Sequence, residues 1–141
     1  MIGAGTMGTG VANVFTTAGC ADVRLMARHQ HTLEKAGRRI ARSPQILGFG
    51  EDDRERSGAA DRPVICLTIS FDEALWGCEL VIESISKDLD AKLDVLRRAE
   101  AAASGSAILT SNISSVRIEE EPRLRGDAAW QVRRYYWCQP A

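Results

Sequence analysis

Three glycines near the start of the chain have the spacing of a phosphate-binding turn. Gly3, Gly5 and Gly8 form the pattern G-x-G-x-x-G, with Thr6 and Met7 between the last two. In such a turn the first glycine permits a tight bend after a strand, the second lets a pyrophosphate approach the backbone, and the third lets a helix pack closely on a sheet. Free N–H groups and the positive end of the helix dipole would hold the anion. A helix that merely starts in a glycine-rich loop has the same pattern, so the surrounding elements must decide.

The residues that follow the glycines have the pattern of a helix and then a strand. Apolar residues recur at helical spacing, Gly19 ends the run, and residues 23–25 alternate as in a strand. The periodic residues of the helix are Met7, Val11, Val14, Phe15 and Ala18. Only Met1 and Ile2 precede the glycines, where a strand of about five residues belongs. We therefore expect a first strand that is truncated at the N-terminus.

Helices and apolar strands alternate along the rest of the chain. The sequence predicts helices at 32–43, 70–76 and 88–103, strands at 64–69, 80–82, 107–110 and 132–137, and a long connection at 44–63. Ser70 and Glu73 form a capping-box pattern, and residues 80–82 are continuously apolar, as in a parallel strand buried on both faces. This order predicts an α/β fold of the Rossmann type, a doubly wound and mostly parallel sheet with a truncated first strand.

Composition argues against several classes of partner. The chain of 141 residues has 18 basic and 19 acidic residues and a net charge of −1, which favours neither nucleic acid nor an anionic membrane. No apolar run approaches the roughly 20 residues of a membrane span, and the basic region of a signal peptide is missing. We expect a single domain, long enough for a core, in a soluble cytoplasmic protein.

Neither the cysteines nor the histidines have the spacing of a metal site. The four cysteines are scattered and no C-x-x-C pattern occurs, so we expect reduced and mostly packed thiols. They are Cys20, Cys66, Cys78 and Cys138. His29 and His31 are two positions apart, which predicts surface side chains that point to different sides of an element.

Three ordered motifs together resemble the NAD-binding domain of the 3-hydroxyacyl-CoA dehydrogenases. They are residues 2–8, residues 80–84 with Lys92 downstream, and residues 110–115. The resemblance covers about residues 1–118, whereas the tail at 119–141 is divergent. In that family a helical domain follows the Rossmann domain and completes the active site and the dimer, and this sequence, 1–141, resembles the first domain only. The resemblance implies NAD as cofactor, an acyl-CoA substrate, and a homo-oligomer or a separately supplied helical domain.

The resemblance also implies roles for individual residues. Gly3, Gly5, Thr6, Met7 and Gly8 match the pyrophosphate turn of the family. Ser84, Lys92 and Asn112 lie in the other motifs, and the last two match positions near the ribose and nicotinamide of the cofactor. Ser114 falls where the family has a serine that hydrogen-bonds the 3-oxygen of the substrate. From the residue type alone, Ser114 would instead be a cap or turn serine.

Departures from the family pattern affect the cofactor end of the site. Ala27 and Arg28 stand where the family usually has an aspartate that accepts the ribose hydroxyls. Without this carboxylate, Arg28 could accommodate a 2′-phosphate, which makes NADP an alternative to NAD, or it could be an ordinary surface arginine. Lys87 and Ile113 replace a glutamate and a threonine of the family.

The most serious departure concerns the catalytic base. Tyr135 occupies the position of the family's histidine, 21 residues after Ser114 (135 − 114). A phenol as base at neutral pH would cost on the order of 4 to 5 kcal/mol relative to an imidazole, unless Arg133 or Arg134 lowers its pKa. Two hypotheses follow: the cofactor half of a dehydrogenase whose second part is supplied elsewhere, or a non-catalytic dinucleotide-binding remnant. Tyr135 favours the remnant, and the intact central motifs favour dehydrogenase ancestry.

Overall fold

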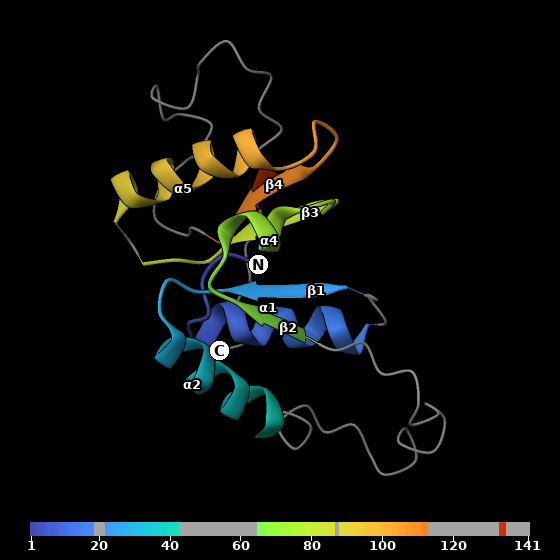
Figure 1. Ribbon diagram of the computed structural model, residues 1–141, viewed down its shortest axis with the longest axis vertical. Helices are drawn as coiled ribbons and strands as arrows, with labels where there is room; N and C mark the ends of the chain where they lie inside the picture. Colours follow the sequence, from blue (N-terminus) through green and yellow to red (C-terminus); the bar gives the residue numbers. More distant parts are fainter. Residues whose placement is uncertain (19–21, 43–64, 87, 113–132, 135–141) are drawn as a thin grey trace.

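The computed structural model describes residues 1–18, 22–42, 65–86, 88–112 and 133–134 (Figure 1). Its elements are α1 (Thr6–Thr17), β1 (Val23–Met26), α2 (Gln30–Arg42), β2 (Ile65–Thr68), α4 (Phe71–Leu75), β3 (Leu80–Glu83), α5 (Leu89–Ala102), β4 (Ile108–Ser111) and β5 (Arg133–Arg134). Each of these elements overlaps a helix or strand that the sequence pattern predicts. The predicted connection at 44–63 lies outside the described residues.

The described strands form one parallel sheet that the first residues of the chain hold together. β1 pairs with β2, and β3, β4 and β5 pair in that order, all in parallel. Ile2 makes parallel bridges to Met26 at the end of β1 and to Glu83 at the end of β3. Its N–H donates to the Ile82 carbonyl at 2.9 Å, and the Ser84 N–H donates to the Ile2 carbonyl at 2.7 Å. The first strand is therefore central, as the Rossmann topology predicts.

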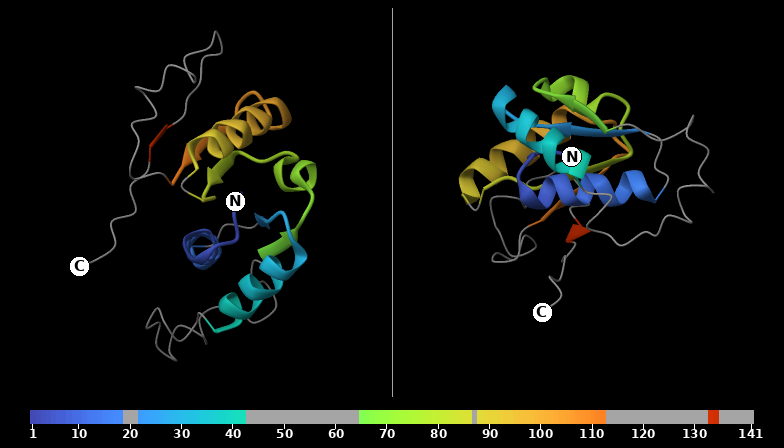
Figure 2. Two further views of the ribbon diagram at one scale, coloured as in Figure 1. Left: turned by 90° about the vertical axis from the view of Figure 1, so that its left-hand side faces the viewer. Right: turned by 90° about the horizontal axis from the view of Figure 1, so that it is seen from below.

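Two apolar clusters form the core, one on each face of the sheet. Seen along the strands, α1 and α2 lie on one side of the sheet and α4 and α5 on the other (Figure 2, left). Between the strands and α1 and α2 lie Ala4, Ala12, Val23, Leu25, Ala27, Leu33 and Ala36. On the other face lie Ile2, Met26, Ala74, Leu75, Val81, Ala99 and Leu109. Both clusters include residues of the central strand or the turn after it, so this segment lies at the middle of the core.

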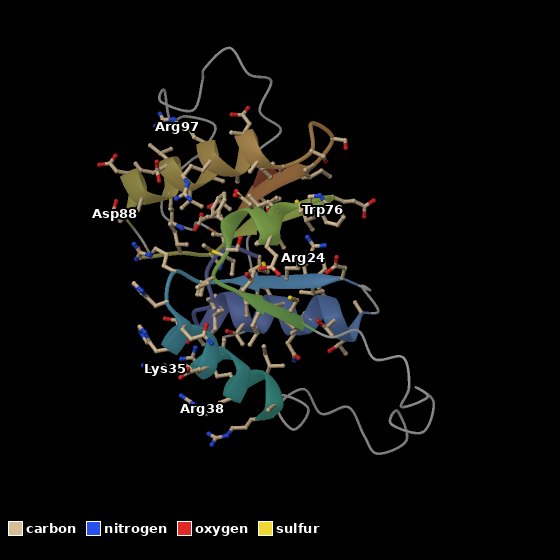
Figure 3. All side chains as sticks on the ribbon, in the orientation of Figure 1. Arg24, Lys35, Arg38, Trp76, Asp88 and Arg97 are labelled. Carbon is tan, nitrogen blue, oxygen red and sulfur yellow. The ribbon has the colours of Figure 1, made fainter. Side chains whose placement is uncertain are left out.

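Arg24 joins β1 to the end of α4. Its guanidinium pairs with Asp22 at 2.5 Å and donates to the carbonyl groups of Glu73 at 2.9 Å and Trp76 at 2.6 Å. The guanidinium also lies 5.9 Å from the centre of the Trp76 ring (Figure 3). The hydrogen bonds satisfy carbonyl groups that a helix end leaves without partners.

Helix ends and helix faces differ in detail from the predictions. The Ser70 hydroxyl accepts from the Glu73 N–H at 3.2 Å, as in a capping box. The Glu73 carboxylate, however, accepts from the Thr68 hydroxyl at 2.5 Å, and this hydroxyl also receives the Ser70 N–H at 3.0 Å. Only half of the predicted box is present, because Thr68 takes the place of the second half. In α1, Met7 and Val14 of the predicted apolar stripe are exposed, because the small residues of the helix face the sheet.

The histidine and cysteine predictions are partly wrong. His29 and His31 are exposed but stack with ring centroids 5.5 Å apart, because His29 precedes α2 and the two do not belong to one regular element. Cys66 and Cys78 are free thiols; Cys66 is exposed, and burial raises the pKa of Cys78. Cys20 and Cys138 lie outside the described residues. Within the described ranges we find neither a metal-binding group of histidine, cysteine and acidic side chains nor a helix with the length and apolarity of a membrane span.

Candidate functional site

Two of the three glycines occupy positions that leave no room for a side chain. Gly3 leaves the central strand with φ +108°, and a Cβ there would lie 2.6 Å from the carbonyl carbon of Ser84. A Cβ on Gly8 would overlap the carbonyl oxygen of Gly3. The tight bend and the close helix packing that the pattern predicts are therefore present. As a result, the turn rests directly on the loop after β3.

The middle glycine, in contrast, borders open space. No atom lies within 4 Å of a Cβ built on Gly5. Gly5 is the N-cap of α1, no side chain caps this helix, and its first turn has no acidic residue. The first helical hydrogen bond runs from the Thr9 N–H to the Gly5 carbonyl at 3.0 Å, so the N–H groups of residues 6–8 point out of the helix end. This arrangement suits a bound anion that approaches the backbone closely.

The helix end lies where ligands bind in open parallel sheets. α1 begins at the carboxyl end of the central strand, between β1 and β3. The chain leaves this strand through α1 to β1 on one side, and it returns from β2 through α4 to β3 on the other side, so strand order reverses here. Crevices at such switch points receive ligands in doubly wound folds.

On one side of the turn, the end of β1 carries a cation in place of a carboxylate. Ala27 is buried among the α1 and α2 residues and offers no polar side chain. Arg28 follows on the surface, and no ion pair joins it to another described residue. The next helix, α2, has no acidic residue in its first turn and presents Lys35 and Arg38 (Figure 3). Arg28 and α2 therefore bring cations to this side of the turn, and Glu34 is the acidic residue of the helix.

On the other side of the turn, a buried carboxylate gathers three donors. Glu83 is fully buried at the end of β3. Its carboxylate accepts from the Ile85 N–H at 2.5 Å, from Lys92 Nζ at 2.6 Å and from the Ser111 hydroxyl. Lys92 is 3% exposed, and its ammonium also donates to the Ile85 carbonyl at 3.3 Å. The loop after β3, α5 and the end of β4 therefore meet at one side chain.

Two further predicted site residues meet above this network. Asn112 Nδ2 donates to the Ser84 hydroxyl at 3.2 Å, and the Asn112 N–H donates to the Glu83 carbonyl at 2.8 Å. The structure thus places Ser84, Lys92 and Asn112 at the same edge of the sheet as the glycine turn. Their contact with a cofactor stays a prediction. Ser114 and Tyr135, with Lys87 and Ile113, lie outside the described residues.

The prediction from sequence missed the role of Glu83 in this network. Its signal was available, since Glu83 is a single carboxylate that ends an apolar strand, and Lys92 follows in the first turns of the next helix. A charged residue in such a strand needs a buried partner. The pairing with Lys92 satisfies this need.

The sheet order and the glycine turn at its switch point define a Rossmann-fold domain of the type found in dinucleotide-dependent dehydrogenases. Residues 1–123 match the family described as 3-hydroxyacyl-CoA dehydrogenase, NAD binding domain. The chain belongs to this family.

Relatives and solved structures agree with this assignment. The chain is 31% identical over 125 residues to a probable 3-hydroxyacyl-CoA dehydrogenase of Caenorhabditis elegans, covering 85% of this chain and 40% of the relative. It is 28% identical over 126 residues to the mitochondrial hydroxyacyl-coenzyme A dehydrogenase of Mus musculus, covering 84% and 39%. The crystal structure of (S)-3-hydroxybutyryl-CoA dehydrogenase PaaH1 from Ralstonia eutropha superposes with a TM-score of 0.66 at 26% identity, covering 82% of this chain and 40% of that one. The chain therefore spans about two fifths of the length of these relatives.

Proposed function

We propose that the chain binds a nicotinamide dinucleotide at the glycine turn, as the cofactor-binding part of an L-3-hydroxyacyl-CoA dehydrogenase. When bound, the nicotinamide would exchange a hydride with C3 of the substrate. The observation that carries the proposal is the contrast between the glycines. Gly3 and Gly8 are sterically required, whereas Gly5 leaves open space at an uncapped helix end. This is the cradle that a pyrophosphate needs.

The remaining residues fit a dinucleotide laid across this edge of the sheet. The adenosine half would lie at the end of β1, beside Arg28, and the nicotinamide half over the ends of β3 and β4. There Ser84 and Asn112 supply polar groups, and Lys92 is buried against Glu83 beneath them. Ser114 would hold the 3-oxygen of an acyl-CoA, and a helical domain or a second copy would complete the site.

The residues at the end of β1 predict only a weak preference between NAD and NADP. Ala27 offers no acceptor to the ribose 2′-hydroxyl, and the exposed Arg28 offers a cation to a 2′-phosphate. We expect the two cofactors to differ in affinity by less than tenfold, which corresponds to about 1.4 kcal/mol. A strong preference for NAD would show that Arg28 does not reach the ribose.

A second candidate is a dinucleotide-binding module without catalysis. Tyr135, at the position of the family's catalytic histidine, favours it, since a phenol is a poor base at neutral pH. Both candidates require the same cofactor site, so binding is measured first and turnover second.

A fluorescence titration with NADH and NADPH tests the site, and two glycines of the chain provide matched variants. Gly5→Ala places a methyl group in the open space of the turn and is expected to raise the Kd for NADH by about tenfold or more. Gly10→Ala adds a methyl group to α1, also with no atom within 4 Å, and should leave the Kd unchanged. Failure of the folded chain to bind either cofactor at millimolar concentration, or equal effects of the two variants, would contradict the proposal.

A further inference from the structure

We propose that Glu83 is a positioning residue, whose buried carboxylate fixes the loop after β3 and thereby shapes the nicotinamide half of the site. The inference rests on the proposed function, because it requires a dinucleotide at this edge. Glu83 itself is fully buried and touches no ligand position. Its effect passes through the groups that it holds.

The first step of the argument is the convergence of donors on one side chain. Three donors from three different elements reach the Glu83 carboxylate: the Ile85 N–H, Lys92 Nζ and the Ser111 hydroxyl. Lys92 also donates to the Ile85 carbonyl at 3.3 Å, so both polar groups of the Ile85 backbone are held. The loop is therefore tied to α5 and β4 through Glu83.

The second step is the contact between this loop and the glycine turn. The Ser84 carbonyl group lies against Gly3 so closely that a Cβ on Gly3 would be 2.6 Å from its carbon and 3.1 Å from the Ile85 nitrogen. The side chain of the same Ser84 receives the Asn112 amide at 3.2 Å. The Ser84 N–H donates to the Ile2 carbonyl at 2.7 Å, which holds this main chain at the turn independently of the Glu83 carboxylate. A displacement of the loop beyond Ser84 would therefore move chiefly the polar groups at the ends of β3 and β4.

The third step identifies the half of the ligand that is affected. In a Rossmann sheet the adenosine ribose lies at the strand that follows the first helix, and the second mononucleotide lies on the other side of the central strand. Here the first of these strands is β1, and the Glu83 network lies under the ends of β3 and β4. Loss of the network should therefore weaken contacts to the nicotinamide half and spare those to adenosine.

A purely stabilising role accounts less well for the network. A buried ion pair contributes little net stability, since the desolvation of both charges offsets their attraction. A carboxylate with several donors does, however, fix the geometry of the groups around it. A stabilising role and a positioning role predict different changes in the Kd values of two ligands that both bind at the glycine turn.

The test compares the Kd values of NADH and ADP, because ADP contains only the adenosine and pyrophosphate parts. Glu83→Leu removes all three hydrogen bonds and is expected to raise the Kd of NADH about tenfold or more, with that of ADP within about twofold. Glu83→Gln keeps an acceptor for Ile85 and a partner for Ser111, so it should keep NADH binding within about threefold. Parallel changes for both ligands, or equal losses in the two variants, would overturn the inference.

Ser111→Ala covers the case in which Glu83→Leu does not fold, because it removes only one of the three donors. It should weaken NADH binding several-fold without affecting ADP, and an unchanged ratio of the two Kd values would overturn the inference. If the folded wild-type chain binds neither ligand, the proposed function fails and this inference with it. If the wild type binds both and no variant acts selectively, the inference alone fails.

Discussion

The amino group of Met1 in the 1–141 chain gives a stability prediction with a defined pH range. This group lies in the centre of the sheet and donates to the Arg24 carbonyl at 2.8 Å. Burial lowers the pKa of the Met1 amine from its ordinary value of 8.0 to about 6, and the charge of Arg24 adds to the effect. The folded chain therefore favours the neutral amine.

The sign and the size of this effect on the free energy of unfolding follow from the difference in the pKa of the amine between the folded and the unfolded chain. Above pH 8 the amine is neutral in both the folded and the unfolded chain, so burial of the group carries no charge penalty. Below about pH 6 it is protonated in both states, and the folded state bears the full cost of a buried charge. The difference of about two pKa units corresponds to about 2 to 3 kcal/mol. The free energy of unfolding should therefore fall by this amount as the pH falls from above 8 through 6.

Urea denaturation between pH 5.5 and 8.5 measures this change, and Nα-acetylation supplies a matched control. The acetylated Met1 keeps an N–H for the Arg24 carbonyl but cannot be protonated, while all side chains are the same in both chains. We expect equal stability at the upper end of the range and a more stable acetylated chain at the lower end. A difference that is constant with pH would refute the reasoning.

Three other predictions concern packing, anchoring and turnover. Gly8→Ala should lower the free energy of unfolding by about 1 to 3 kcal/mol, because its Cβ would overlap a main-chain carbonyl; an unchanged urea midpoint would contradict this. Arg24→Met removes two hydrogen bonds to carbonyl groups at the end of α4, those of Glu73 and Trp76, and should cost about 1 to 2 kcal/mol, whereas Asp22→Asn, at a side chain 61% exposed, should cost less than about 1 kcal/mol. If urea denaturation gave equal losses of unfolding free energy for the two variants, the bonds from Arg24 to the end of α4 would not anchor that helix. The 1–141 chain should not measurably oxidise 3-hydroxyacyl-CoA; turnover that Tyr135→Phe abolishes would make this phenol the base.

Most of the fold could be predicted because the signals for its elements are local. The helix at Leu89–Ala102, for example, begins after Asp88, an acidic residue at the predicted helix start. Its carboxylate accepts from the Ala91 N–H at 3.1 Å and so caps the helix. The central place of Ile2 follows from the topology of a doubly wound sheet, although only a few residues mark the strand. The close approach of Gly8 to the Gly3 carbonyl is likewise local, whereas the steric demand at Gly3 comes from the distant Ser84.

The parts that sequence reasoning missed depend on neighbours from distant segments. Lys92 was predicted to lie near the cofactor, and its burial against Glu83 becomes visible only when α5 packs on β3. Thr68 replaces half of the capping box at Ser70 because the end of β2 lies next to the start of α4. The roles of Ser114 and Tyr135 stay predictions, since both lie outside the described residues.

The position of Ile2 in the sheet has a consequence for protein synthesis. The ribosome adds Ile2 before both of its bridge partners, Met26 and Glu83. The pairing of β1 with β2 requires the chain only as far as Thr68, whereas the second bridge of Ile2 requires β3 as well. At about 5 to 20 residues per second, the middle of the sheet stays incomplete for seconds while the chain grows. During this interval the segment around Ile2 can pair with β1, but its other edge, which later pairs with β3, stays unpaired; other strands can bind such an edge.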